Sequence, residues 1–133
     1  MMCGATVVVF VMLVYTQLRI TTARIKKIST AMATYKINHE NGLFVDIRAS
    51  KDFSKGHIAG SENISAAEIR QGKVQRIGSA KDRPVIIVGR DKFDSECFHS
   101  ARLLKKQGFK KVFTLDGGIT QWSTENLPLS FRN

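Results

Sequence analysis

The sequence predicts an α/β domain built on a parallel sheet with helices on both faces, preceded by one N-terminal transmembrane helix. Three observations support this fold class. Residues 1–18 contain no charged side chain. Short strand-like runs then alternate with helix-like segments. The runs are continuously apolar, as in strands that are buried on both faces. A chain of 133 residues has room for one domain of modest size.

The first segment, residues 1–23, is predicted to be a membrane anchor. Residues 7–15 are apolar throughout, and a spanning helix needs about 20 residues. Residues 20–23 can extend the run past Arg19, whose long side chain can snorkel to the interface. A cleaved signal peptide would begin with basic residues and end at a small-x-small site. Neither feature is evident here, so we expect the segment to cross the bilayer.

Basic residues directly after the apolar run predict the orientation of this anchor. Such residues favour the cytoplasmic side of a membrane, so we expect the N-terminus outside and the C-terminal domain in the cytoplasm. They are also expected to contact anionic lipid. The residues concerned are Arg19, Arg24, Lys26 and Lys27.

The formal net charge of +10 raises the question of nucleic-acid binding. The chain shows no aromatic–basic stripe, zinc-ligand spacing or recognition-helix pattern, so nucleic acid is not an expected partner. Cys3 and Cys97 lie in different segments, which argues against a disulfide. His39 and His99 have no metal-ligand spacing to either cysteine. We therefore expect neither a metal nor a cofactor.

Five strands follow from the apolar runs. Ile25 and Ile28 alternate with basic residues, as in a short edge strand. The run that ends at Asp46 is a compact buried strand, and the run that begins at Pro84 is the strongest strand in the sequence. The expected strands are residues 24–29, 43–47, 61–64 (a brief strand or loop), 84–88 and 111–115.

Helices are expected between these strands. Ser29 and Thr30 can cap the first one. Gly56 breaks the second, and Gly108 is suited to the position after the end of the fourth. The expected helices are residues 31–37, 49–55, 66–71, 96–107 and 119–124, with a turn at residues 116–118 before the last.

Several motifs in this pattern resemble those of rhodanese-like domains. In the first half they are Val45-Asp46-Ile47-Arg48, Asp52-Phe53 and Gly56-His57-Ile58-Ala59-Gly60-Ser61-Glu62-Asn63-Ile64. In the second half they are residues 84–88, Ala101, Leu104, Gly108-Phe109, Val112, Leu115-Asp116-Gly117-Gly118 and Trp122. The resemblance spans residues 24–130, leaves residues 131–133 as a tail, and implies a parallel five-stranded sheet.

Within this family the chain looks most like the membrane-anchored, single-domain YibN-type proteins of proteobacteria. The N-terminal apolar segment and the run Glu125-Asn126-Leu127-Pro128-Leu129 carry that likeness. It implies a location in the bacterial inner membrane, with a single pass.

Six motif residues are expected to support the fold. Asp46 can bond backbone amides at its strand end, and Arg48 can pair with an acid such as Asp52. His57 is expected to bracket a turn through hydrogen bonds. The other three would reverse the chain, allow close packing or fill the core: Gly117, Gly118 and Trp122.

The resemblance also implies a catalytic cysteine directly after the central strand. Backbone N–H groups and a helix N-terminus would stabilise a persulfide there. Gly89 occupies this position, and the loop to Glu96 is longer than the family pattern. Phosphatases of the same fold need cysteine at the start of this loop and arginine at its end, and neither is present. The expected nucleophile is therefore missing.

Cys97 is the remaining candidate nucleophile, and three interpretations stay open. Near a helix N-terminus it could form a thiolate, although Asp94 and Glu96 oppose that charge. With Ala101 and Leu104 it has the spacing of a buried helix face, where a cysteine is inert. A redox or modification role is the third interpretation. A loop for a sulfur-donor anion would comprise Gly89, Arg90, Asp91, Lys92 and Ser95.

Two functions follow from these interpretations. The first is a binding or scaffolding module that contacts an unidentified membrane or cytoplasmic protein, or anionic lipid. The second is a sulfurtransferase in which Cys97 takes sulfur from thiosulfate or a persulfide and passes it to cyanide or a thiol. The first predicts a buried Cys97, and the second an exposed Cys97 within reach of Arg90. The absence of cysteine at position 89 favours the binding module.

Overall fold

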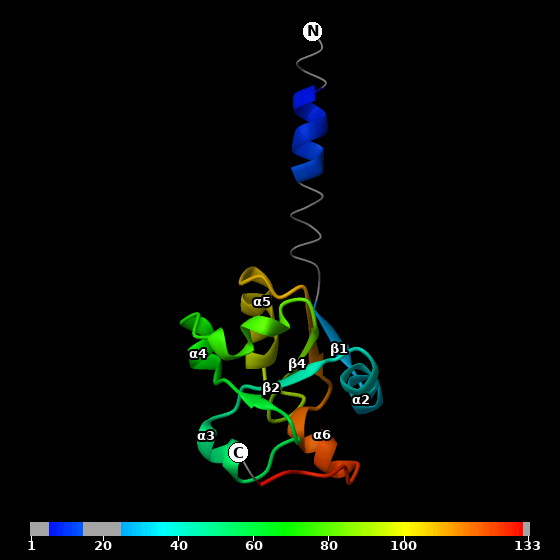
Figure 1. The fold of residues 1–133 in the computed structure, drawn as a ribbon, viewed down its shortest axis with the longest axis vertical. Helices are drawn as coiled ribbons and strands as arrows, with labels where there is room; N and C mark the ends of the chain where they lie inside the picture. Colours follow the sequence, from blue (N-terminus) through cyan, green and yellow to red (C-terminus); the bar gives the residue numbers. More distant parts are fainter. Residues whose placement is uncertain (1–5, 15–24, 132–133) are drawn as a thin grey trace.

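Five parallel strands form the centre of the computed structural model, which describes residues 6–14 and 25–131 (Figure 1). The strand order is β1-β5-β4-β2-β3. This arrangement confirms the α/β class and the parallel five-stranded sheet predicted from the sequence. The strands are β1 (Lys26–Ile28), β2 (Leu43–Asp46), β3 (Glu62–Asn63), β4 (Pro84–Val88) and β5 (Lys111–Leu115).

The central strand β4 is buried along its whole length, because strands flank it on both edges and helices cover both faces. Its side chains alternate between the two faces, as the geometry of a strand requires. Val85 and Ile87 belong to the first hydrophobic cluster, and Ile86 and Val88 belong to the second, on the opposite face of the sheet. The continuous apolar run at residues 84–88 is therefore explained by burial on both sides.

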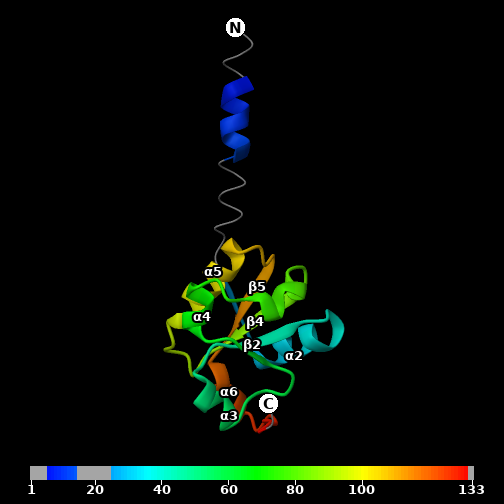
Figure 2. The same ribbon diagram turned by 60° about the vertical axis from the view of Figure 1, so that its left-hand side comes forward.

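Helices of the two faces belong to different clusters. The first face is covered by α4 (Ala66–Arg70), the 3₁₀ helix η1 (Gln75–Ala80) and α5 (Glu96–Lys106). Figures 1 and 2 both show α4 and α5 side by side. The second face is covered by α2 (Thr30–His39) and α6 (Gly118–Thr124), while α3 (Ser50–Ser54) follows β2.

The register of the sheet brings the ends of two strands together. Asp46, the last residue of β2, is the partner of Val88, the last residue of β4. Gly89 directly follows Val88 in the chain. The carboxyl ends of parallel strands are where ligands bind in open α/β sheets, so this edge is the place to look for a site.

The predicted transmembrane helix over residues 1–23 is wrong. Among the described residues, no helix is long and apolar enough to cross a membrane. The same finding contradicts the expected location in the bacterial inner membrane, with one pass and the N-terminus outside.

Parts of that prediction fall on residues 1–5 and 15–24, which lie outside the described residues. Arg19 and Arg24 are among them, and Lys26 and Lys27 are exposed on β1. The expected contact of these cations with anionic lipid stays a prediction.

Candidate functional site

The loop of residues 89–95 joins β4 to α5 at the carboxyl edge of the sheet, and the start of α6 holds its first two residues. The backbone N–H of Ile119 donates to the Gly89 carbonyl at 2.9 Å. Thr120 donates to the Arg90 carbonyl through its backbone N–H at 3.0 Å and through its hydroxyl at 2.8 Å. The β4–α5 loop is therefore anchored on the helix that follows the last strand.

Glycine at position 118 makes this close approach possible. Gly118 has a φ of 58°, and a Cβ atom there would lie 2.6 Å from the Gly89 carbonyl oxygen. A side chain would be excluded by both the backbone conformation and the contact. Gly117 also has a positive φ, of 79°.

Carboxylates of the loop itself occupy several of its backbone N–H groups. Asp94 accepts hydrogen bonds from the N–H groups of Arg90 at 3.0 Å and Glu96 at 3.1 Å. The Asp91 carboxylate accepts from the N–H of Phe93 at 2.9 Å. The Asp94 side chain is only 11% exposed, and the Arg90 guanidinium lies 3.9 Å from it. The negative charge of the Asp94 carboxylate thus lies inside the loop.

Cys97 lies in the first turn of α5, directly behind this loop, and its side chain is 7% exposed. Burial raises the pKa of the Cys97 thiol to about 12, and the negative charges of Asp94, Asp46, Asp91 and Glu96 add to the effect. The helix N-terminus alone would lower this pKa, but desolvation and the four carboxylates outweigh it. The exposed thiol that the sulfurtransferase hypothesis requires is absent at this position.

Gly89 and Cys97 share one space. A Cβ atom on Gly89 would overlap the Sγ atom of Cys97, and it would lie 2.8 Å from a carboxylate oxygen of Asp94. The thiol of Cys97 therefore fills the volume into which a side chain at position 89 would project. Sequence reasoning missed this coupling, because the two residues are separated by a loop of unknown path.

We expect the variant Gly89→Cys, which places a cysteine directly after the central strand, to be destabilised by about 1–3 kcal/mol through overpacking. The double variant Gly89→Cys/Cys97→Ala should recover most of that loss, because alanine vacates the space. Urea unfolding of the four proteins in this double-mutant cycle measures the coupling. Gly78→Cys is the matched control, since a Cβ atom at Gly78 meets nothing within 4 Å. Additive losses in the cycle would contradict the shared volume.

Arg48 forms an ion pair with Asp46, two residues before it. Its guanidinium donates to both oxygens of the Asp46 carboxylate at 2.8–3.1 Å, and its backbone N–H donates to the same carboxylate at 3.0 Å. Both side chains are almost fully buried. An acid such as Asp52 was the expected partner of Arg48, and the partner in the structure is Asp46.

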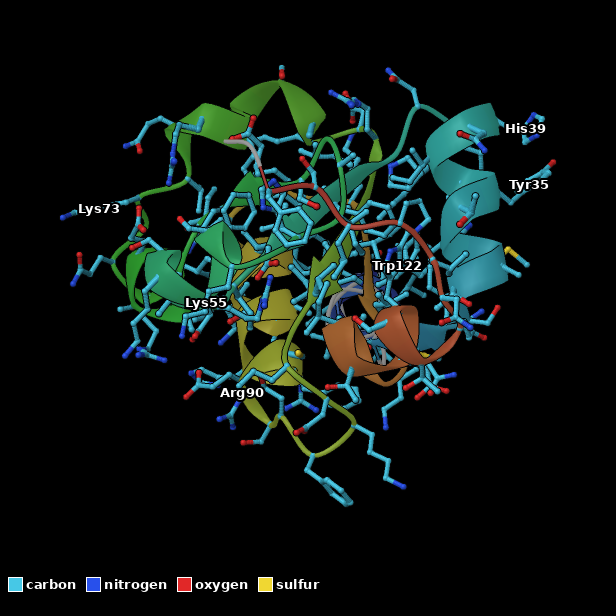
Figure 3. The ribbon with its side chains drawn as sticks, turned by 90° about the horizontal axis from the view of Figure 1, so that it is seen from below. Tyr35, His39, Lys55, Lys73, Arg90 and Trp122 are labelled. Carbon is cyan, nitrogen blue, oxygen red and sulfur yellow. The ribbon has the colours of Figure 1, made fainter. Side chains whose placement is uncertain are left out.

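His57 and Trp122 make their ring contacts and side-chain hydrogen bonds with residues outside the loop of residues 89–95. The His57 ring stacks on Phe53 with 3.7 Å between centroids, and its Nδ1 lies 2.8 Å from the Phe53 carbonyl oxygen. Trp122 donates from Nε1 to the Pro128 carbonyl at 2.9 Å. Figure 3 shows this end of the domain from below, with Arg90 at its edge and Trp122 on α6.

A hollow of about 190 Å³ opens beside the loop. Its lining residues come from the segment after β2, from the start of α4 and from the loop itself: Ile47, Arg48, Ala49, Asp52, Ala66, Arg90, Asp94 and Glu96. Within residues 6–14 and 25–131, no group of three His, Cys, Asp or Glu side chains is arranged to hold a metal ion.

Comparison with known proteins gives the family. Residues 30–125 match the rhodanese-like domain. The chain is 40% identical to the uncharacterized protein YibN of Escherichia coli K12 over 125 residues, which cover 94% of this chain and 86% of that one. It is 34% identical to the thiosulfate sulfurtransferase GlpE of Pseudoalteromonas translucida over 103 residues, covering 73% and 88% of the two chains.

A solved structure shows the same fold. The BH2092 protein of Bacillus halodurans superposes with a TM-score of 0.70 at 22% identity, over 79% of this chain and 76% of that one. Together, the five-stranded parallel sheet, the motifs at the ends of β2 and β5 and these matches show that the chain belongs to the rhodanese-like domain family.

Proposed function

We propose that this protein is a rhodanese-like domain without sulfurtransferase activity that works as a binding or scaffolding module. One observation supports the proposal above the others. The Asp94 carboxylate occupies the N–H groups of Arg90 in the loop and of Glu96 at the start of α5, beside a thiol that is buried and protonated. The loop is thus filled by its own side chain, and its outer surface is left for contacts with another protein.

Sulfur transfer needs a thiolate, and this site disfavours one. With a pKa of about 12, roughly one Cys97 thiol in 100,000 is ionised at neutral pH. An anionic donor such as thiosulfate would also have to displace Asp94 and approach Asp91 and Glu96. Each of these steps places like charges near each other in a partly buried site.

A sulfurtransferase is the second candidate, because the Cys97 Sγ atom lies where a side chain on Gly89 would project. The relative GlpE carries the name thiosulfate sulfurtransferase. In that reaction the Cys97 thiolate would attack the outer sulfur of thiosulfate and release sulfite. The resulting persulfide would then pass its terminal sulfur to a thiol.

Intact-mass spectrometry after incubation with thiosulfate distinguishes the two candidates. The full chain is used with Cys3→Ser, so that any adduct arises at Cys97. We expect no added sulfur, and we expect iodoacetamide to modify Cys97 only when the protein is unfolded in urea. A rhodanese with its cysteine in place serves as the positive control. One added sulfur that disappears with Cys97→Ala would reject the non-catalytic module.

A further inference from the structure

The loop that would hold a substrate in an active relative instead projects an aromatic ring. Phe93 is 82% exposed, more than any other large apolar side chain among the described residues. The Lys92 ammonium lies 5.1 Å from the centre of its ring, and Arg90 is exposed three residues earlier in the loop. An exposed aromatic residue beside a cation is a typical anchor for a protein contact.

The backbone around Phe93 is held in place without help from packing of the ring. The Asp91 carboxylate bonds the Phe93 N–H, and Asp94 bonds the N–H groups of Arg90 and Glu96. The carbonyls of Gly89 and Arg90 are bound to α6. A loop fixed in this way loses little conformational entropy when it binds, which favours association.

The hollow beside the loop is complementary to this anchor. Its apolar walls come from Ile47, Ala49 and Ala66, and its volume is about 190 Å³. A cavity of about 150 Å³ accepts benzene, so a phenyl ring fits. The Asp52 carboxylate also lines the hollow, and it forms no ion pair with any residue that the structure describes. An unpaired carboxylate is thus available to a cation that arrives with the ring.

We propose that the module binds a second copy of this chain, with Phe93 of each copy inserted into the hollow of the other. Arg90 and Asp94 line the hollow and belong to the loop that carries Phe93, so anchor and hollow are neighbours. A twofold axis can therefore place the Phe93 ring of each copy in the hollow of the other at the same time. In this arrangement Lys92 of one copy faces Asp52 of the other. The inference rests on the proposed function, because a loop that admits sulfur donors cannot stay covered.

Removal of the anchor is the first test. Sedimentation velocity of the full chain over a range of concentrations should show a reversible, weak dimer, since the contact is small. Phe93→Ala should raise the dissociation constant at least about tenfold. Tyr35→Ala is the matched control, because Tyr35 is an exposed aromatic residue on α2, away from Arg90 in Figure 3. It should leave the dissociation constant unchanged.

Charge exchange is the second test, and it identifies the pairing. Lys92→Glu and Asp52→Lys should each weaken the dimer, and Lys92→Glu/Asp52→Lys should restore it, because the pair is re-formed with reversed sign. A double variant as weak as the single ones would overturn the proposed arrangement. A monomer at every concentration would do the same, as would association that is equal in all variants, for example through the exposed apolar helix of residues 6–14.

The sulfur-uptake measurement on the same samples separates the two proposals. A chain that neither dimerises nor gains sulfur refutes the second copy as partner and leaves the non-catalytic module in place. A chain that gains sulfur at Cys97 refutes both.

Discussion

Arg48→Ala is expected to lower the free energy of unfolding by about 3–5 kcal/mol. Asp46 is fully buried, and Arg48 is its ion-pair partner, with an exposed fraction of 8% for the arginine side chain. Alanine would leave a buried carboxylate with one backbone N–H and no countercharge. The same substitution removes the hydrogen bond from the guanidinium to the Gly56 carbonyl, at 2.8 Å. The turn before His57 therefore loses a support as well.

Urea unfolding followed by circular dichroism measures this effect. The matched control is Arg76→Ala, which breaks an exposed ion pair with Glu68 and should cost less than about 1 kcal/mol. Asp46→Ala/Arg48→Ala should be less destabilised than the sum of its two single variants, because it leaves no unpaired charge. A loss for Arg48→Ala no larger than that for Arg76→Ala would show that the buried pair does not support the fold.

The strands and helices of the domain were largely predictable from the sequence. Each expected element from residue 24 onward is present, and its ends differ from the prediction by at most two residues. Continuous apolar runs, Ser29 as an N-cap and glycines after helices were sufficient signals, because burial and capping are local in sequence. Ser29 does accept a hydrogen bond from the Met32 N–H.

The 3₁₀ helix η1 was not predicted, and its sequence explains why. Residues 75–80 lack an amphipathic period, and Ile77 has a φ of −111° and a ψ of 15°, outside helical values. Short 3₁₀ turns form where packing requires them rather than where propensity is high. Ile77 is nevertheless one of the buried residues of the first hydrophobic cluster.

The site was predictable only in part. The missing cysteine at Gly89 could be read from the chain, and so could the acidic neighbours of Cys97. The overlap of the Gly89 and Cys97 side-chain volumes could not, because it depends on the path of seven residues between them. The position of the Asp94 carboxylate was equally unpredictable. It depends on the same loop path, which lets this carboxylate accept hydrogen bonds from the Arg90 and Glu96 N–H groups.

The prediction of a membrane anchor failed for a different reason. Hydropathy identified an apolar segment, but it does not determine whether that segment forms a helix long enough to cross a bilayer. Among the described residues, no such helix is present.

Trp122→Ala is the other variant with a large expected effect, again about 3–5 kcal/mol. Trp122 is buried between α6 and the sheet, and its ring meets Phe44 edge-on at 5.7 Å. Alanine would leave a cavity in the second hydrophobic cluster. It would also remove the hydrogen bond from Nε1 to the Pro128 carbonyl, which ties the C-terminal segment to the domain.

The consequences should extend to both ends of α6. Ser130, two residues after Pro128, pairs with His57 through two backbone hydrogen bonds, so the segment after α6 should exchange its amide hydrogens faster. The start of the same helix holds Gly89 and Arg90, so the loop of Phe93 should loosen too.

Trp122→Phe keeps most of the packing and should lose only about 1 kcal/mol. Urea unfolding gives the free energy of unfolding of Trp122→Ala and Trp122→Phe, and hydrogen exchange gives the amide exchange rates of their loop and C-terminal segment. A loss below about 1 kcal/mol for Trp122→Ala would mean that this ring does not support the second face of the sheet. The rigid loop on which both proposals depend would then need another support.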